Sequence, residues 1–241
     1  MFGIKLLLLA LLSMYSFAVC SADKLTLVTY SEVPFATQTG NVKQGLVIEF
    51  IEALFKQTDL QYEILFFPLK RGMAMAESSL NTCVLPIERN QQREVHYSWI
   101  GPVMVSRYGL FSASPSQPPL VALNDAKLSS IGSFLGSGIG EYLTQFGYRV
   151  DLTNNDTLNV KKLQRGRIDF WAADLVSAKA IMRDNDIHFG EPKIIFFTSI
   201  RAMACHIDLP MATQKKLNDA LLKLYQSGYM AQLHQKYGLS L

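Results

Sequence analysis

Apolar positions along residues 25–85 follow the periods of strands and helices in turn. Leu25–Tyr30 and Tyr62–Phe67 are rich in branched and aromatic residues, and both predict strands. Between them, a polar loop is expected up to Gly45, and an apolar face then repeats at helical spacing in Val47, Phe50, Ile51, Leu54 and Phe55. Pro68 suits a first helical turn and opens a helix to about Ser79, and Cys83–Leu85 predicts a short buried strand. This order predicts parallel strands joined by crossover helices.

A second alternating unit follows a strand-like segment, Val103–Phe111, and a turn-rich break at Ser114–Pro119. The predicted strands are Ser130–Phe134, Tyr148–Leu152 and Ile168–Ala172, and the predicted helices are Glu141–Phe146, Thr157–Gln164 and Leu175–Arg183. Asp156 and Asp174 stand at helix starts, where a carboxylate can cap backbone N–H groups. After an extended segment, Ile194–Cys205, the tail is expected to be helical.

Two repeats of the strand–helix pattern predict an α/β protein with two lobes. Residues 23–108 and 200–241 would form lobe one, and residues 109–199 would form lobe two. Two strands would cross between the lobes. The cleft between the lobes would then lie at the carboxyl ends of strands, where α/β sheets bind their ligands.

The first 22 residues have the three-part pattern of a secretory signal peptide. Lys5 supplies a positive start, Leu6–Leu12 is an apolar run, and small residues end the segment at Ala22. Cleavage after Ala18, lipidation at Cys20 and an uncleaved anchor are the alternatives. We therefore expect export across the inner membrane and a location in the periplasm.

Composition narrows the class of protein further. The 241 residues include 23 Lys and Arg against 20 Asp and Glu, and this small excess gives no reason to expect nucleic-acid binding.

Beyond the signal segment two cysteines remain, Cys83 and Cys205. Export makes a disulfide between them plausible, and two buried thiols are the alternative. The four histidines show no metal-ligand spacing and no nucleophile motif is present, so we expect neither a metal nor a cofactor.

Six segments occur in an order that points to a known family. They are Gly45–Phe50 (GLVIEF), Pro68–Met73 (PLKRGM), Arg89–Glu94 (RNQQRE), Trp99–Pro102 (WIGP), Gly166–Asp174 (GRIDFWAAD) and the ending from Ser227 to Gly238. With the signal peptide before them, they resemble the bacterial extracellular solute-binding proteins of family 3. These are the periplasmic amino-acid-binding proteins that serve ABC importers, and the resemblance covers nearly all of the chain after residue 22.

The resemblance implies the type II periplasmic-binding fold, in which two lobes joined by two crossing strands trap a ligand between them. It also implies that Arg93 binds the ligand's α-carboxylate, with Arg89 just upstream as a second candidate. Asp174 matches the aspartate that takes the α-ammonium. From the residues alone other roles stay open, because Arg93 could pair with Glu88 or a neighbouring carboxylate and Asp174 could serve only as a helix cap.

Two further pairs of residues are candidates for ligand contact. Ser137 and Gly138 lie in a glycine-rich turn before a helix, where backbone amides can hold an anion. Tyr30 and Phe35 lie at and just after the end of a strand, where rings can cover the apolar part of a solute, although most aromatic residues are simply core.

The resemblance predicts a monomeric, non-enzymatic protein that captures a small polar solute, an amino acid or related carboxylate, for an ABC permease. The alternatives are the input domain of a sensor and an enzyme of the dehydratase or hydrolase type on the same scaffold. An enzyme would need a general acid or base in the cleft, and Glu32, Glu49 and Glu88 are the carboxylates near predicted strand ends.

Overall fold

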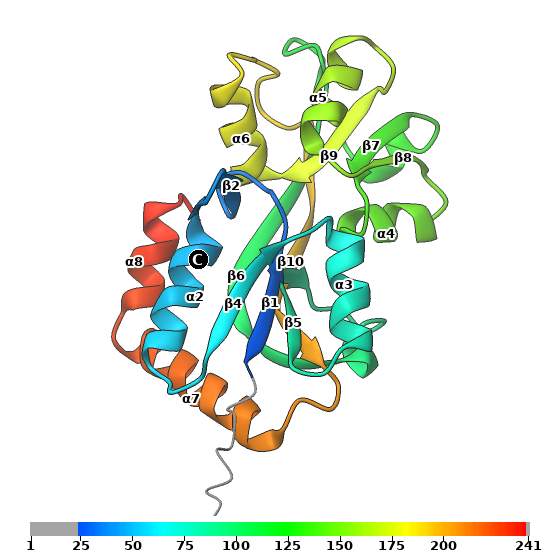
Figure 1. Cartoon of the computed structure of the whole chain (residues 1–241). Helices are drawn as coiled ribbons and strands as arrows, with labels where there is room; N and C mark the ends of the chain where they lie inside the picture. Colours follow the sequence, from blue (N-terminus) through cyan, green and yellow to red (C-terminus); the bar gives the residue numbers. More distant parts are fainter. Residues whose placement is uncertain (1–23, 240–241) are drawn as a thin grey trace, which may run out of the picture.

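The computed structural model describes residues 24–239, and the predicted signal peptide lies outside this range. One continuous sheet contains eight strands in the order β4-β1-β5-β10-β6-β9-β7-β8. Figure 1 shows that this sheet runs through two lobes, a lower one that contains both ends of the described chain and an upper one formed by the middle of the sequence.

Lobe one, the lower lobe, is built on parallel strands as the sequence predicts. These strands are β1 (Leu25–Thr29), β4 (Tyr62–Phe66) and β5 (Thr82–Glu88). The helices around them are α2 (Leu46–Lys56), α3 (Leu69–Ser78), α7 (Met211–Gln226) and α8 (Tyr229–Lys236). Helices α2, α7 and α8 pack together on one face of the sheet and α3 covers the other (Figure 1), so both faces of the sheet are buried.

Lobe two, the upper lobe, repeats the same arrangement with three strands and three helices. The strands are β7 (Ser130–Phe134), β8 (Arg149–Thr153) and β9 (Phe170–Asp174), and β7 pairs in parallel with both of the others. The helices are α4 (Gly138–Gln145), α5 (Asp156–Gln164) and α6 (Leu175–Asp184). Each lobe has its own hydrophobic clusters on the two sides of its part of the sheet.

Two long antiparallel strands join the lobes, β6 (Tyr97–Phe111) and β10 (Ile194–His206). One end of β10 pairs with β5 in lobe one, and the far end of β6 pairs with β9 in lobe two. The lobe boundaries predicted after residues 108 and 199 fall within these two strands.

Among the local predictions that differ from the structure are the following three. The segment expected to be only a polar loop contains a hairpin of β2 (Thr37–Thr39) and β3 (Val42–Gln44). Strand β5 extends beyond Cys83–Leu85 at both ends. Asp156 is the first residue of α5 rather than its cap, because the side chain of Asn155 accepts the N–H of Thr157 at 2.7 Å.

The glycine that precedes the first predicted helix is required by its position. Gly45 has φ 120°, which side-chain-bearing residues rarely adopt, and a Cβ there would lie 2.4 Å from the carbonyl oxygen of Phe35. After Gly45, the apolar face predicted from the sequence is buried along α2. This face anchors the helix against the lobe-one core.

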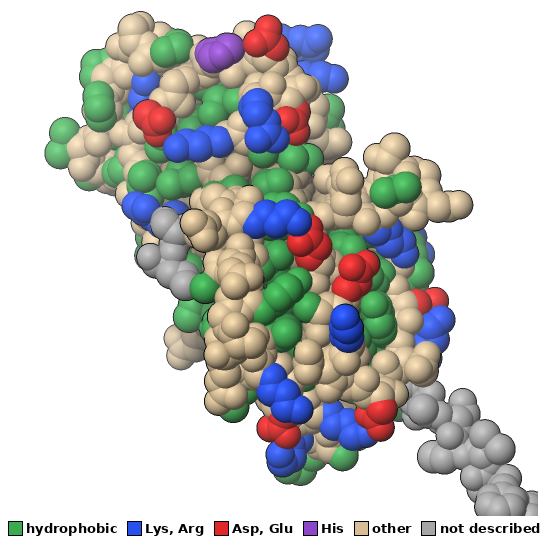
Figure 2. All heavy atoms as spheres, turned by 90° about the vertical axis from the view of Figure 1, so that its left-hand side faces the viewer, with side chains coloured by type: hydrophobic (Ala, Val, Ile, Leu, Met, Phe, Trp, Pro, Cys, Tyr) green, Lys and Arg blue, Asp and Glu red, His purple; other side chains and the backbone are tan. Residues whose placement is uncertain are grey.

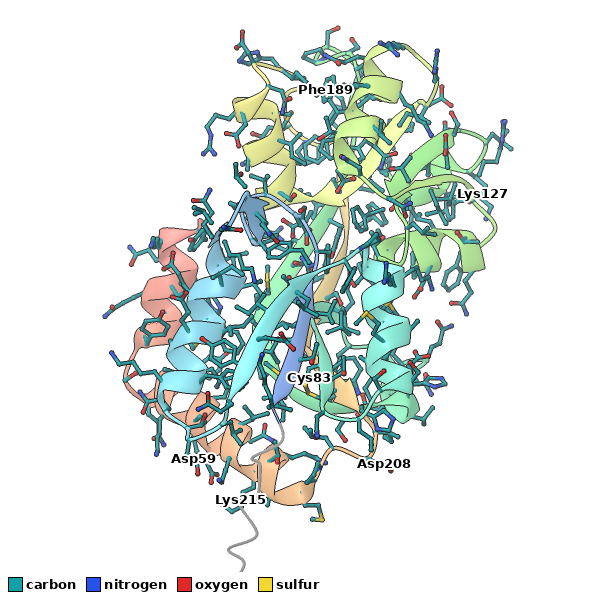
Figure 3. The ribbon with its side chains drawn as sticks, viewed as in Figure 1. Asp59, Cys83, Lys127, Phe189, Asp208 and Lys215 are labelled. Atoms are coloured by element: carbon teal, nitrogen blue, oxygen red, sulfur yellow. A yellow bond between two sulfur atoms is a disulfide. The ribbon has the colours of Figure 1, made fainter. Side chains whose placement is uncertain are left out.

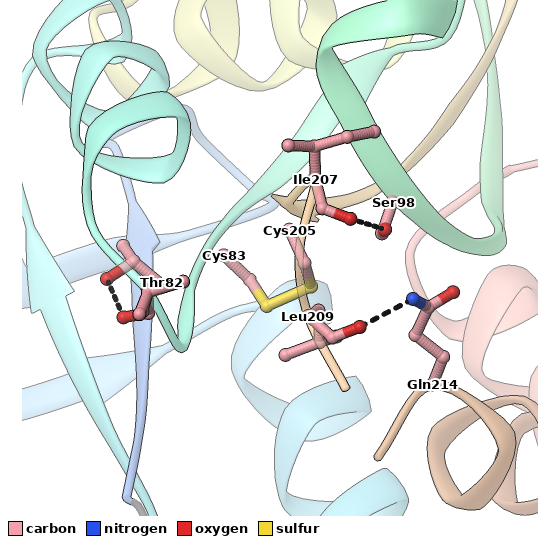
Figure 4. Close-up of a disulfide and its surroundings, with 8 residues drawn as sticks. Thr82, Cys83, Ser98, Cys205, Ile207, Leu209 and Gln214 are labelled. Carbon is pink, nitrogen blue, oxygen red and sulfur yellow. Dashed lines mark hydrogen bonds between the residues drawn. A yellow bond between two sulfur atoms is a disulfide. The ribbon is translucent and has the colours of Figure 1, made fainter. Parts of the chain in front are cut away.

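Cys83 and Cys205 form a disulfide between two neighbouring strands, as Figure 4 shows. Around it, the hydroxyl of Ser98 donates to the carbonyl of Ile207 at 2.8 Å, and the amide of Gln214 donates to the carbonyl of Leu209 at 2.7 Å. In Figure 3 Cys83 lies within the lower lobe, while Asp59 and Lys215 lie toward its lower edge. The bridge therefore fixes the returning strand to the first half of lobe one.

None of the helices within residues 24–239 combines the length and the apolar character needed to cross a membrane. On the face shown in Figure 2, basic and acidic side chains are interspersed over both lobes.

Candidate functional site

A cavity of about 380 Å³ lies between the two lobes. Its lining comes from Tyr30–Val33 and Phe66–Pro68 in lobe one, and from Phe134, Asn154–Thr157, Ser177 and Ile181 in lobe two. Most of these segments follow the carboxyl ends of β1, β4, β7 and β8, as the strand–helix order predicts. The volume is that of a site for a small organic molecule.

A smaller compartment of about 20 Å³ shares four lining residues with this cavity and is called the inner compartment below. Its size suits about one water molecule or one small polar group. The ionisable residues that line it are Glu32, Glu88, Tyr30, Tyr108, Asp156, Asp174 and Arg201. The two lobes thus bring charged groups together at the inner end of the cavity.

Arg201 is the one arginine in the lining of these two spaces, and its side chain is 1% exposed. Its Nη2 donates to Glu32 Oε2 at 2.6 Å and its Nη1 donates to Glu32 Oε1 at 3.3 Å, which makes a forked ion pair. It also donates to the hydroxyl of Tyr30 and to the carbonyl of Pro86. Burial opposes the charge of Arg201, but Glu32 and the nearby tyrosines outweigh it, so the pKa of Arg201 is raised and the guanidinium stays charged.

Glu88 forms a second buried network beside the first. The hydroxyl of Tyr108 donates to Glu88 Oε1 at 2.7 Å, and Arg93 donates from Nη1 to Glu88 Oε2 at 3.4 Å. Burial works against ionisation of Glu88, but Arg201, Arg93 and the Tyr108 hydroxyl together lower its pKa. Glu88 is therefore an ionised carboxylate that is already fully engaged by the protein.

Asp174 begins α6 and caps it, as predicted. Its Oδ1 accepts the N–H groups of Val176 and Ser177, both at 2.9 Å. Its Oδ2 is buried and accepts no hydrogen bond within the described residues, although the side chain lines the inner compartment. Burial and then the charge of Glu32 raise the pKa of Asp174 to about 6, and Ser177, Arg201 and the nearby Ser106 hydroxyl offset this only in part. At neutral pH this oxygen is a negatively charged hydrogen-bond acceptor that has no donor within the described residues.

Asp156 is a second carboxylate with a raised pKa, and it lines both spaces. Its Oδ1 accepts from Trp171 Nε1 at 2.9 Å and from Asn159 Nδ2 at 3.1 Å. Burial raises the pKa of Asp156 to about 6, the two hydrogen bonds lower it, and the charge of Glu32 adds to the rise. Two carboxylates from lobe two therefore face Glu32 from lobe one.

Arg93 lies between the lobes but outside the lining of either space. It is 4% exposed, and it donates to the carbonyl of Glu88 at 3.1 Å, to the carbonyl of Gly136 at 2.8 Å and to Glu141 Oε2 at 2.6 Å. The alternative role that the residues left open, a pair with Glu88, is present here. The role of Arg93 as anchor of a ligand carboxylate stays a prediction.

The other predicted contacts are divided between the site and its surroundings. Arg89 is exposed and pairs with Glu94, with its Nε 2.9 Å from Glu94 Oε2. Tyr30 lines both spaces, whereas Phe35 belongs to the lobe-one core and its ring lies 5.5 Å from the Arg201 guanidinium carbon.

Ser137 lines the inner compartment and caps α4, because its hydroxyl accepts the N–H of Gly140 at 3.1 Å. Gly138 lies against Glu88, and a Cβ at position 138 would come within 3.0 Å of the Glu88 side chain. The glycine therefore permits the close approach of the two lobes at this point.

Sequence reasoning did not select Arg201, Tyr108, Asp156 or Ser177 as site residues. Arg201 carried the clearest signal, because a lone arginine interrupts an apolar strand segment and a charge buried in a strand needs a partner. Glu32 was named only as a carboxylate for the enzyme alternative, and Glu88 for that role and as a possible partner of Arg93. Among residues 24–239, no group of three or more His, Cys, Asp and Glu side chains is arranged to hold a metal ion.

Comparisons with known protein structures identify the fold. No protein-family model and no curated protein sequence matches the chain. Among solved structures, an ancestral arginine-binding protein bound to arginine has a TM-score of 0.77 at 18% identity, covering 89% of this chain and 97% of that one. A histidine kinase sensor domain similar to periplasmic binding proteins has a TM-score of 0.80 at 16% identity, covering 88% and 95%.

A third similar structure is an ancestral amino-acid-binding protein described as a precursor of cyclohexadienyl dehydratase. Its TM-score is 0.76 at 14% identity, and the match covers 89% of this chain and 94% of that one. At such identities the likeness concerns the fold alone. It confirms the predicted type II periplasmic-binding fold.

Proposed function

We propose that the protein binds a small polar solute that carries an ammonium group, in the cavity between its lobes. The observation that carries this proposal is the buried Asp174 Oδ2, an anionic oxygen at the inner end of the cavity without a donor in the described chain. An ammonium group supplies a charge-assisted hydrogen bond and the compensating charge together. Amino acids, the class predicted from the sequence, belong to this group of solutes.

A binding role also agrees with the way in which the cavity is built. Each lobe contributes part of the lining, so a ligand that contacts both lobes would favour the closed arrangement by its differential affinity. We propose that the closed, monomeric protein then docks on an inner-membrane ABC permease in the periplasm. A sensor's extracellular domain is the alternative partner, in keeping with the kinase sensor domain among the similar structures.

One observation favours an enzyme as the second candidate. Asp156 and Asp174 both have a pKa of about 6, which suits a general acid or base near neutral pH. The fold of a dehydratase precursor is also similar. Analysis of each ligand by mass spectrometry after prolonged incubation separates the two roles, because a binding protein returns its ligand unchanged.

A thermal-shift screen tests the proposed function. Amino acids, alkyl amines, dicarboxylates and sugars are added to the protein and to Asp174→Asn, whose side-chain oxygen can still cap α6. We expect at least one ammonium-bearing solute to raise the melting temperature of the wild type in proportion to the logarithm of its concentration, and the variant to lose this shift. The proposal is wrong if only dicarboxylates or sugars stabilise the protein, or if the variant responds equally.

A further inference from the structure

The two buried arginines in and beside the inner compartment are already paired with carboxylates of the chain itself. Arg201 is held by both oxygens of Glu32. Arg93 contacts Glu88 and Glu141, which leaves it without an unmatched charge. A carboxylate on the ligand would have to displace Glu32 or Glu88, and the displaced group would then be a buried, unpaired charge.

The wider cavity offers no other cation in its lining. None of its lining residues is a lysine or an arginine. Lys70 lies nearby but pairs with Glu141 at 3.0 Å. Arg71 is exposed, and its guanidinium carbon lies 4.2 Å from the centre of the Phe67 ring, which lines the cavity. Arg71, which forms no ion pair within residues 24–239, is therefore a candidate beside the cavity that could meet a ligand carboxylate.

The acidic groups of the site favour a cationic ligand. Asp156 and Asp174 form no ion pair with a lysine or arginine of the described chain. Of the buried oxygens without a hydrogen-bond partner within residues 24–239, two belong to side chains that line the two spaces, Asp174 Oδ2 and Ser177 Oγ. Both side chains are at most 3% exposed, and each lines one of the two spaces. These acceptors thus remain for a ligand, whereas the charge of the lining cation Arg201 is matched by Glu32 and only its Nε has no partner in the described chain.

Aromatic rings complete a surface that suits an organic cation. Tyr30, Phe66, Phe67 and Phe134 line the cavity, and Tyr30 and Phe134 contact each other at 5.6 Å between ring centres. The faces of such rings attract alkylammonium and guanidinium groups. They also cover the methylene groups of a linear ligand.

We propose that the ligand is an organic cation without a carboxylate, such as a linear alkyl amine, diamine or guanidinoalkyl amine. One amino group would bind Asp174 Oδ2 in the inner compartment, with Asp156 close by. The alkyl chain would lie along the rings of the wider cavity. This inference deepens the proposed function, since it names the class of solute for the same site, and it can fail while that function stands.

Isothermal titration calorimetry with matched pairs of compounds tests the inference. Putrescine and ornithine, cadaverine and lysine, and agmatine and arginine each differ by one carboxylate, and glutarate serves as the carboxylate without an amine. We expect at least one amine to bind 10-fold or more tightly than its amino acid, a difference of about 1.4 kcal/mol. Glutarate should give no binding heat, and Asp174→Asn should weaken the amine at least 10-fold.

Arg71→Ala is the matched control, because it removes a cation beside the cavity that forms no ion pair within the described chain. Affinity for the amine should be unchanged in this variant. If an amino acid binds as tightly as its amine, or if amino acids bind and amines do not, the inference is overturned and the proposed function survives. A loss of amino-acid affinity in Arg71→Ala would then identify the carboxylate partner. If no ammonium-bearing compound binds, the inference and the proposed function are both wrong.

Discussion

At the scale of single residues, Asp174 holds two roles that use different oxygens. Oδ1 caps α6, while Oδ2 is buried without a partner in the described chain, in a side chain that lines the inner compartment. Its raised pKa of about 6 shows that the folded state disfavours the ionised carboxylate. The helix cap does not require that negative charge. A stable helix start alone would be served equally well by asparagine. The buried charge is therefore best explained by what binds there.

The first prediction concerns the stability of the ligand-free protein against pH. Since the pKa of Asp174 is about 6 in the folded state and about 4 in an unfolded chain, the native state binds more protons between these values. The stabilising contribution is fully present below about pH 4 and is lost as the pH rises through 6. Asp174→Asn should therefore be more stable than the wild type at pH 7.5, by at most about 3 kcal/mol, with a smaller difference at pH 5.

Differential scanning calorimetry of both proteins at the two pH values measures this effect. A difference in melting temperature that stays constant from pH 5 to pH 7.5 would contradict the assigned pKa. Asp169→Asn is a matched control, because Asp169 is an aspartate of the same lobe whose pKa is lowered by hydrogen bonds from Ser130.

The second prediction concerns the affinity for a cationic ligand. A bound ammonium needs the ionised form of Asp174, so protonation and ligand binding compete for the same oxygen. Below pH 6 the affinity should fall, approaching about tenfold for each pH unit if Asp174 alone is titrated. Calorimetric titrations between pH 5 and pH 8 check the slope. Tighter binding at pH 5 than at pH 7.5 would contradict this competition between the proton and the ligand.

At the scale of elements, contacts beside the cavity link α3 and the loop after β5 to α4. Arg93 and Lys70 from lobe one both meet Glu141 on α4, at 2.6 Å and 3.0 Å. Gln92 donates to Gln145 one turn further along, at 2.9 Å. These contacts join surfaces that separate if the lobes open, so they stabilise the closed arrangement.

The third prediction is that Glu141→Gln shifts the ligand-free protein toward an open form. Small-angle X-ray scattering should show a larger radius of gyration, and ligand affinity should fall because closure becomes less favourable. Glu94→Gln is the control, since it removes a surface ion pair with Arg89 within lobe one. Equal radii for all three proteins would show that the contact does not hold the lobes together.

The elements themselves were largely readable from the sequence, because each buries one regular apolar face. Strand β7 and helix α2 follow the predicted ranges closely. The β2–β3 hairpin was missed because its residues are mostly polar and exposed and give no periodic signal. Sequence patterns find elements that pack on a core and overlook those that do not.

The candidate site could be predicted from the sequence only in part. Asp174 could be found because a strand end and a helix cap coincide at one residue. The partners of Arg93 could not be assigned, because Glu141 is 48 residues away and depends on how the lobes meet. The pair of Glu32 and Arg201 lies within lobe one but joins residues that are 169 positions apart in the sequence, which local patterns do not reveal either. Charge matching across lobes is a property of the closed fold, which local patterns do not encode.

At the scale of the whole molecule, the disulfide ties together two segments that are 122 residues apart. It lies in lobe one, away from the cavity lining, and it secures the strand that returns from lobe two. The bridge restricts the unfolded chain more than it shapes the site. Its contribution should therefore appear in stability and not in affinity.

The fourth prediction follows for the double variant Cys83→Ser with Cys205→Ser. Chain-entropy models give a loss of about 4–5 kcal/mol for a loop of this length. Urea unfolding should show a lower midpoint, while the folded variant should bind its ligand as the wild type does. The buried hydroxyls add a cost of their own, so reduced wild-type protein is the second measurement. An unchanged midpoint in both would show that the bridge is dispensable.

The account rests on the claim that a ligand's amino group meets Asp174 between the lobes. A crystal structure of the protein with the tightest ligand from the screen tests this claim most directly. We predict an amino nitrogen about 2.8 Å from Asp174 Oδ2, with Arg93 still bound to Glu88 and Glu141. A ligand carboxylate forked onto Arg93, with Glu88 displaced and Asp174 Oδ2 still without a partner, would contradict it.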